Sequence, residues 1–204
     1  MASSLLLASN SPRRRELLSA AGFEFDTAAP QIEERSDLNL TLREITALNA
    51  VRKGFSIARM HPMKIVLSAD TLVILNDEII GKPRDRDHAA KILRRLSGRV
   101  HEVCSSVLIL HLARARSMTF YEISRVRFRR LNKDAVNEYL AKVNPLDKAG
   151  AYAAQGYGAK IIAKIEGSYT NVVGLPMERT IAALAKFGIR RQTPNEFRPA
   201  RSFA

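Results

Sequence analysis

The sequence predicts an α/β fold in which helices flank a mixed, partly antiparallel sheet. The β-branched apolar run from Ile65 to Leu75 is typical of a buried strand. Two further strand-like segments, 100–112 and 117–131, follow each other directly, so they are expected to pair. Helical patterns are mixed among the strands without a strict β-α-β alternation. This order favours a mixed sheet over an all-parallel one.

The first elements are a short strand at residues 5–8, a polar turn and a helix. Ser11 and Pro12 fit the N-cap and the first position of this helix. A helix N-terminus offers unpaired N–H groups and a partial positive charge. Ser9 and Ser11 before it, and Arg13 just inside it, therefore predict a phosphate site. The alternative is a solvated basic first turn.

The next segment contains a predicted strand around Phe23 and Phe25, a loop and a long helix. The loop carries Glu33 and Glu34, which are ordinary solvated charges unless they face another functional group. A capping box at Thr41–Glu44 begins the helix.

Ile45, Leu48 and Val51 form the expected apolar face of this long helix. By this pattern alone, Lys53 would lie at the surface.

The strand from Ile65 carries one carboxylate, Asp70, in apolar surroundings. Burying an unpaired carboxylate costs several kcal/mol, so Asp70 needs a metal ion, a lysine or backbone donors. Asn76-Asp77 fits a hairpin turn, and the returning strand ends at Lys82. A carboxylate on one arm and a lysine at the end of the other suggest a site for a metal and a phosphate. The alternative is a strand-end aspartate bonded to nearby backbone.

The second half continues with a helix capped by Asp85 or Asp87, a helix capped by Asn132 and a Gly/Ala-rich loop from Asp147 to Lys160. Such a loop lets backbone approach a ligand closely. Strands are expected at 161–166 and 169–173, and a last helix begins at Pro176.

Arginines alternate with apolar residues along the segment 117–131. Arg125, Arg127 and Arg129 share one face, with Val126 and Phe128 on the other. This pattern indicates an exposed basic face, and a nucleic-acid groove is the less favoured interpretation.

The length and composition indicate a soluble chain of one large domain or two tightly joined lobes, with anionic partners. The chain has 204 residues, a formal net charge of +13 and a pI of about 10.4. A strongly basic chain attracts nucleotides, nucleic acid or anionic surfaces. One cysteine and the lack of a signal peptide or membrane span predict a cytoplasmic location. Residues 1–189 are expected to form the domain, and residues 190–204 a mobile basic tail.

Three long segments together resemble the Maf family of nucleoside triphosphate pyrophosphatases. They are LASNSPRRRELL from Leu7, the region from ADTLVILNDEIIGKP to AAKILRRLSGRVHEV between Ala69 and Val103, and DKAGAYAAQGYGAKIIAKIEGSYTNVVGLP from Asp147. The resemblance covers the chain up to about Arg190. It implies hydrolysis between the α and β phosphates, to the monophosphate and pyrophosphate. It also implies Mg²⁺, with Mn²⁺ or Co²⁺ as substitutes, and frequent homodimers. The implied fold is elongated, like that of inosine triphosphatases, with two lobes around a central cleft.

The resemblance also assigns roles to residues. Asp70 matches the catalytic proton acceptor. Substrate choice is assigned to three positions, Arg13, Thr71 and Gln155. Contact with the phosphates is assigned to hydroxyl and basic side chains, namely Ser9, Ser11, Arg13, Lys53 and Lys82. Metal binding is assigned to carboxylates, which suit a hard cation, namely Asp70 with Glu33 or Glu34.

Gln155 before Gly156 is the form found in the dTTP/UTP group of the family, whereas the 7-methyl-GTP group has a sequence like SEG there. Uracil presents an N–H between two carbonyls, and an amide can both donate and accept. The resemblance therefore predicts dTTP, UTP and modified pyrimidine triphosphates as substrates. The alternative for Gln155 is an ordinary loop residue.

Two positions depart from the family pattern, since Asn144 replaces a frequent acid and Ser105 a usual threonine. The alternatives for the whole chain are a 7-methyl-GTP-type pyrophosphatase and a weakly catalytic protein that binds nucleic acid or a cell-division partner.

Overall fold

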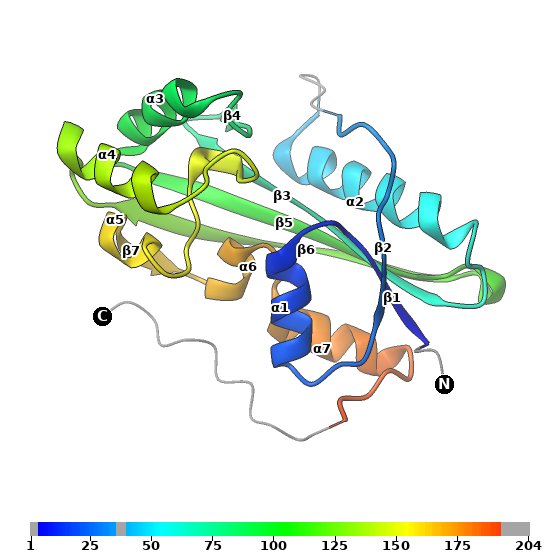
Figure 1. Cartoon of the computed structure of the whole chain (residues 1–204). Helices are drawn as coiled ribbons and strands as arrows, with labels where there is room; N and C mark the ends of the chain where they lie inside the picture. Colours follow the sequence, from blue (N-terminus) through cyan, green and yellow to red (C-terminus); the bar gives the residue numbers. More distant parts are fainter. Residues whose placement is uncertain (1–3, 36–39, 193–204) are drawn as a thin grey trace. The chain divides into compact units, whose positions relative to one another are not determined.

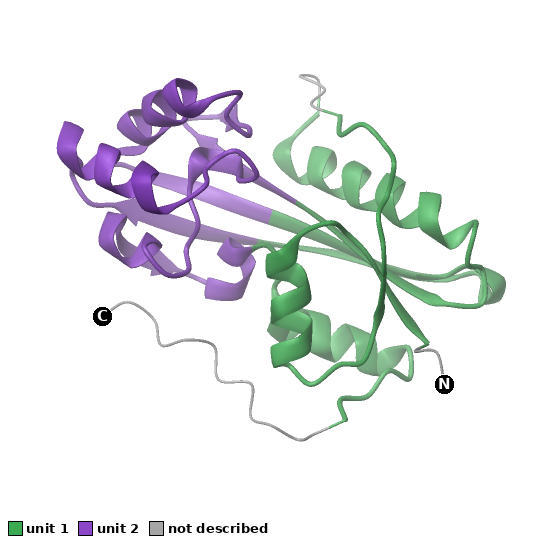
Figure 2. Ribbon diagram, viewed as in Figure 1, with its two compact units in different colours: residues 1–70, 105–122, 174–198 green, residues 71–104, 123–173, 199–204 purple. Residues whose placement is uncertain are grey.

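The computed structural model describes residues 4–35 and 40–192, which form two compact units (Figure 2). Unit 1 is drawn from residues 1–70, 105–122 and 174–198, and unit 2 from residues 71–104, 123–173 and 199–204, each where described. The two lobes around a central cleft that the family resemblance implies stay a prediction. The tail beyond Gln192, predicted to be mobile, lies outside the described residues.

The described strands form one seven-stranded sheet (Figure 1). Their bounds are β1 Leu5–Ala8, β2 Asp26–Ala28, β3 Ile65–Leu75, β4 Glu78–Ile80, β5 Val100–His111, β6 Arg116–Phe128 and β7 Ile162–Glu166. The order is β2-β1-β3-β5-β6-β7, with β4 paired to β3. Strand β1 pairs parallel with β2 and β3, whereas β3–β4 and β6–β7 are antiparallel. The mixed, partly antiparallel sheet is therefore confirmed.

The helices of the described chain are also those that the sequence predicts, with two exceptions taken up below. The α-helices are α1 Pro12–Ala20, α2 Leu42–Ala58, α3 Arg86–Leu96, α4 Lys133–Lys142, α5 Gly158–Ile161, α6 Tyr169–Val173 and α7 Met177–Lys186. Short 3₁₀ turns occupy η1 Leu112–Arg114 and η2 Ala149–Ala151. No helix within these described parts has the length and apolar character needed to cross a membrane.

The predicted caps are confirmed for the longer helices. The side chains of Ser11, Asp85 and Asn132 each accept a hydrogen bond from a backbone N–H in the first turn. The capping box of α2 has both of its bonds in place. Each cap satisfies an N–H that the helix itself cannot pair, so the sequence alone determines where these helices begin.

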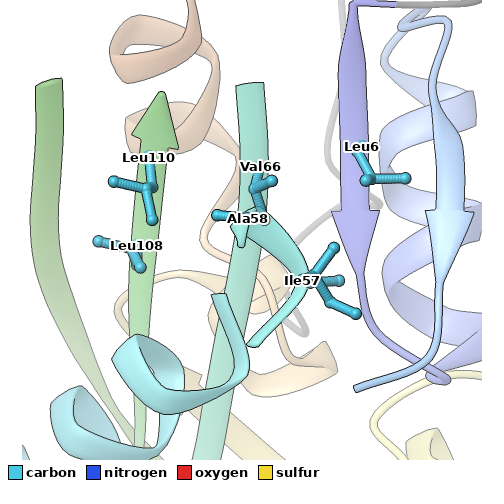
Figure 3. Close-up of a cluster of buried hydrophobic side chains, with 7 residues drawn as sticks. Leu6, Ile57, Ala58, Val66, Leu108 and Leu110 are labelled. Atoms are coloured by element: carbon cyan, nitrogen blue, oxygen red, sulfur yellow. The ribbon is translucent and has the colours of Figure 1, made fainter. Parts of the chain in front are cut away.

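The core of unit 1 joins α2 to the sheet (Figure 3). Buried apolar side chains come from β1, β3, β5 and the C-terminal half of α2, namely Leu6, Ala8, Ile57, Ala58, Val66, Leu108 and Leu110. Burying each large apolar side chain contributes about 1.5–3 kcal/mol. This packing holds α2 against the strands that carry the candidate site.

The predicted strand at 169–173 is wrong, because this segment forms α6. Ser168 accepts a hydrogen bond from the N–H of Asn171 at 3.2 Å, as a helix cap does. The buried Asn171 amide donates to the carbonyl of Val103 and to the hydroxyl of Ser124. These tertiary bonds override the β-branched composition of the segment.

Two other expectations need adjustment. The strand expected around Phe23 and Phe25 is displaced to β2, Asp26–Ala28, because only those residues pair with β1. The short helix α5 and the turn η2 lie in the Gly/Ala-rich loop, where the sequence predicts only a loop.

Candidate active site

An ion-paired cluster surrounds Asp70 in unit 1. The ammonium of Lys53 donates to Asp70 Oδ1 at 2.6 Å and to Glu34 Oε1 at 2.7 Å. The Asp70 and Lys53 side chains are only 5% and 10% exposed, whereas Glu34 is 43% exposed. A buried carboxylate requires such a partner, so Lys53 is the partner that the sequence left open.

Asn49 completes the surroundings of Asp70. Its amide donates to Asp70 Oδ2 at 3.2 Å and to the carbonyl of Arg35 at 2.9 Å. Its own oxygen accepts from the Arg35 N–H at 2.8 Å. Asn49 thereby attaches the loop that carries Glu34 to the helix that carries Lys53. The sequence interpretation missed this residue.

Lys53 is buried because α2 presents a different face to the sheet than expected. Leu48 and Val51 are only half-buried, whereas Ile45, Asn49 and Lys53 at four-residue intervals are buried. The expectation of a surface lysine is therefore wrong. A polar residue in register with buried apolar positions of a helix is the signal that could have identified both Asn49 and Lys53.

Close packing next to Lys53 keeps α2 near the sheet. A Cβ added at Gly54 would lie 2.6 Å from side-chain atoms of Leu108 and of Ser68, so only glycine allows this approach. The Ser68 hydroxyl also donates to the Ala50 carbonyl at 2.7 Å. The reach of Lys53 to Asp70 therefore depends on contacts far apart in the sequence.

The turn that was predicted to bind phosphate lies beside the buried side chain of Arg14. The Ser9 hydroxyl accepts from the Ser11 N–H at 3.1 Å and from Arg14 Nη1 at 3.3 Å. Arg14 Nε also donates to the Gly174 carbonyl at 2.9 Å. Arg13, the predicted contact, is half-buried in the same helical turn.

Arg14 was not singled out in the sequence, although it lies on the same helix face as the buried Leu17 and Leu18. Burial lowers the pKa of Arg14, and the negative charges of Asp70 and Glu34 act in the opposite direction. Since an arginine pKa lies so far above neutrality, the side chain stays a cation. Its positive charge and the two carboxylates therefore belong to one electrostatic site.

The carboxylates of this site fit a divalent cation in part. Asp70 and Glu34 converge on one ammonium, so their oxygens can approach a single cation from two sides. Mg²⁺ is commonly held by one or two carboxylates together with substrate phosphates and water. The Glu33 side chain is exposed, and its carbonyl accepts from Arg52 at 3.0 Å. No group of three or more His, Cys, Asp or Glu side chains within residues 4–35 and 40–192 has the arrangement of a metal centre.

The other predicted residues lie in unit 2. Thr71 follows Asp70 on β3 and is half-buried. Lys82 is exposed just after β4, in a hairpin whose turn residues Asn76 and Asp77 both have positive φ, as the predicted turn requires. The N–H of Gly150 donates to the Gly81 carbonyl at 3.2 Å, which brings the Gly/Ala-rich loop beside Lys82.

Gln155 lies on this loop and is half-buried. The loop is fastened on the N-terminal side of Gln155 by two tyrosines. The Tyr152 hydroxyl lies 2.8 Å from His101 Nε2, and the Tyr139 hydroxyl accepts from the Ala153 N–H at 2.9 Å. The Gln155 carbonyl accepts from the Gly158 N–H at 3.1 Å. These bonds hold the backbone of Gln155 on both sides.

Adding one methyl group to this loop should displace it. A Cβ at Gly158 would lie 2.0 Å from the carbonyl oxygen of Ala153, and a backbone atom cannot yield as a flexible side chain does. Gly158→Ala is therefore expected to lower the free energy of unfolding by about 1–3 kcal/mol, measured by urea denaturation. Gly81→Ala meets open space and should stay within about 0.5 kcal/mol of the wild type. Equal stability of the two variants would contradict the prediction.

His101 should make stability depend on pH. Burial lowers its pKa from 6.5 to about 4. Between these values the unfolded state binds more protons, so the free energy of unfolding should fall as the pH drops from about 6.5 to 4, by up to about 3 kcal/mol.

Urea denaturation at pH 7, 5.5 and 4.5 measures the slope of the free energy of unfolding against pH. His101→Gln should flatten it, and His61→Gln, at an exposed position, should not. An unchanged slope in His101→Gln would refute the assignment.

Asn144, one of the two departures from the family pattern, has a local role in the turn after α4. Its side-chain oxygen accepts from the Leu146 N–H at 3.2 Å, and its carbonyl accepts from the ammonium of Lys148 at 2.8 Å. Ser105, the other departure, is fully buried.

Comparison with known proteins assigns the chain to a family. Residues 4–187 match the family described as Maf-like protein. A dTTP/UTP pyrophosphatase of Bacillus pumilus is 42% identical over 185 residues, which cover 91% of this chain and 97% of the relative. Proteins with the same name are 41% identical in Symbiobacterium thermophilum, over 90% of this chain and 94% of the relative, and 40% identical in Dictyoglomus turgidum, over 92% and 98%.

Similarity to solved structures is more distant. The Staphylococcus aureus Ham1 protein superposes with a TM-score of 0.43 and 14% identity, over 61% of this chain and 71% of that protein. That likeness is too weak to bear on function, whereas the sequence matches span most of both chains. The match to the family over nearly all described residues, together with relatives about 40% identical over nine-tenths of the chain, shows that this chain belongs to the Maf family.

Proposed function

We propose that the protein is a nucleoside triphosphate pyrophosphatase that hydrolyses the bond between the α and β phosphates of dTTP, UTP and modified pyrimidine triphosphates. The observation that carries this proposal is the buried Lys53 ammonium between the carboxylates of Asp70 and Glu34. The name dTTP/UTP pyrophosphatase of the relatives supports the same substrates.

In this reaction water attacks phosphorus and the bridging oxygen between the α and β phosphates leaves. Asp70 would orient this water and accept its proton, and Lys53 and Asn49 would hold the carboxylate in position for it. The water oxygen remains on the monophosphate, and pyrophosphate leaves with the bridging oxygen.

Basic groups would neutralise the phosphate oxygens, whose charge is the main obstacle to attack. Lys53 and Arg13 would bind them beside the Ser9 and Ser11 turn, and Lys82 is the further phosphate contact that the family resemblance implies. Arg14 would act through its charge and by fixing the Ser9 hydroxyl. Arginine contacts can be bidentate, which orients the phosphate as well as binding it.

A divalent cation, Mg²⁺ in the first place and Mn²⁺ or Co²⁺ as substitutes, would be held by Asp70 and Glu34 and would supply charge neutralisation on the phosphates. Glu33 is the second choice, because its side chain is exposed and it is the neighbouring Glu34 that contacts Lys53. Gln155 and Thr71, with Arg13, would select the base and sugar.

Pyrophosphate release from a panel of triphosphates with Mg²⁺ tests the proposal. UTP and dTTP are expected to be the best substrates, ahead of CTP, GTP and 7-methyl-GTP. Preference for 7-methyl-GTP would favour the alternative of a 7-methyl-GTP-type pyrophosphatase. No release above blank from any triphosphate would exclude the enzymatic function. A cytoplasmic location, which the single cysteine of the sequence supports, and a homodimer both stay predictions.

A further inference from the structure

The part of the sheet that lies in unit 2 exposes more basic than acidic side chains on one of its faces. Along β6, Val126 and Phe128 are buried, and Phe128 packs edge-on against His101 and Tyr152. Arg125 and Arg127 point to the opposite face and are exposed. Neither arginine has a role in the proposed reaction, so the proposed reaction does not explain why they lie together.

A shallow hollow of about 70 Å³ lies on this face. We define the cationic hollow by the residues that line it, which come from β5, β6 and β7: Val100, Arg125, Arg127, Lys164 and Glu166. Arg125 is paired in register with Glu166, and Arg127 with Lys164. Three cations therefore face a single acid across neighbouring strands.

The ion pairs and the pKa of Glu166 show that its surroundings are positively charged. Its carboxylate lies 3.0 Å from Lys164 and 4.0 Å from Arg125, and both partners are more than half exposed. The pKa of Glu166 is lowered, first by its hydrogen bond and charge interaction with Lys164 and then by Arg125 and Arg127. Glu166 is therefore ionised, and its single negative charge offsets only one of the three positive charges of the hollow.

We propose that the cationic hollow binds the phosphate backbone of a nucleic acid without reading its sequence. Guanidinium groups contact phosphate in bidentate fashion, and two residues along a strand are about 7 Å apart, so Arg125 and Arg127 can contact different phosphates. The lining contains no aromatic side chain on which a base could stack. Binding should therefore be electrostatic and should weaken steeply with salt.

The charge of the chain separates this occupant from the alternatives. A net charge of +13 attracts a polyanion, and the three cations of the hollow repel the same hollow of a second copy. Val100 is the one apolar residue of the lining, which leaves little to insert into a lipid surface. A polyanion with regularly repeated phosphates is the ligand that this geometry matches best.

Fluorescence anisotropy with a labelled single-stranded oligonucleotide of about 20 nucleotides tests the proposal, with the full chain and salt from about 50 to 200 mM. The variant Arg125→Gln/Arg127→Gln/Lys164→Gln should bind at least about 10-fold more weakly. Its slope of log K against log salt should be shallower by about 2, since each lost phosphate contact removes about 0.7. Glu166→Gln should bind more tightly, because it removes the only acid of the hollow.

The matched control is Lys91→Gln/Lys133→Gln/Lys142→Gln, which removes the same charge from exposed positions on α3 and α4. It should bind within about twofold of the wild type. Equal losses in the two triple variants would overturn the proposal, because net charge alone would then explain binding. Absence of oligonucleotide binding by the wild type would also overturn it. The proposal would also be overturned if the first triple variant lost binding to phosphatidylserine vesicles while its binding to the oligonucleotide stayed unchanged. If the first triple variant melts early, Arg127→Gln should still lower the slope by about 0.7.

Discussion

Replacing Asp70 by Asn is expected to lower the rate of pyrophosphate release from UTP by at least about 100-fold. The amide keeps the size of the side chain, but it cannot accept the proton of water and is a poor ligand for a hard cation. Lys53 would lose one of its two carboxylates and keep Glu34. The measurement is pyrophosphate release with saturating Mg²⁺, and thermal unfolding monitors the fold.

Asp26→Asn is the matched control, since Asp26 is 48% exposed and pairs with Lys64 away from the cluster around Asp70. It should keep wild-type activity within about twofold, because exposed ion pairs contribute little. Full activity of Asp70→Asn would remove Asp70 from the mechanism while leaving the substrate assignment intact. Loss of activity accompanied by unfolding at the assay temperature would instead point to a structural role for the buried ion pair.

Gln155→Leu is expected to reduce the preference for UTP over CTP by about 10- to 100-fold. Leucine has a similar volume but can neither donate nor accept, so two neutral hydrogen bonds to the base would be lost. Gln155→Glu retains only an acceptor, which suits the amino group of cytosine, and should shift the preference towards CTP. The ratio of kcat/KM for UTP and CTP measures both effects.

Gln31→Leu, at an exposed position of unit 1, is the control and should leave the ratio unchanged. If Gln155→Leu keeps the ratio of the wild type, Gln155 is an ordinary loop residue, as the alternative holds. Because the backbone of Gln155 is held through Ala153 and Gly158, a changed ratio without a changed melting temperature would assign the effect to the side chain.

Local features of the chain were predictable because they depend on neighbours within one or two turns. The caps at Ser11, Asp85 and Asn132, and the hairpin turn at Asn76-Asp77, all lie where the sequence predicts them. The clearest exception is α6, where the tertiary bonds of Asn171 to Val103 and Ser124 replace a predicted strand by a helix.

The candidate site was predictable only in part. Asp70 stands out in the sequence as a carboxylate within an apolar strand. Its partner does not, because Lys53 is 17 residues away and looks like a surface lysine until the buried face of α2 is known. Likewise, only the structure distinguishes Glu34, which contacts Lys53, from its neighbour Glu33.

The sequence by itself determined the mixed α/β class, the ends of most helices, the hairpin and the need of Asp70 for a partner, because periodicity, caps and the cost of burying a charge are local properties. The tertiary structure alone decided which groups meet at Asp70. Lys53 reaches it because the missing Cβ of Gly54 lets α2 approach Ser68 and Leu108. That approach joins residues from three separate segments, and no local pattern specifies it.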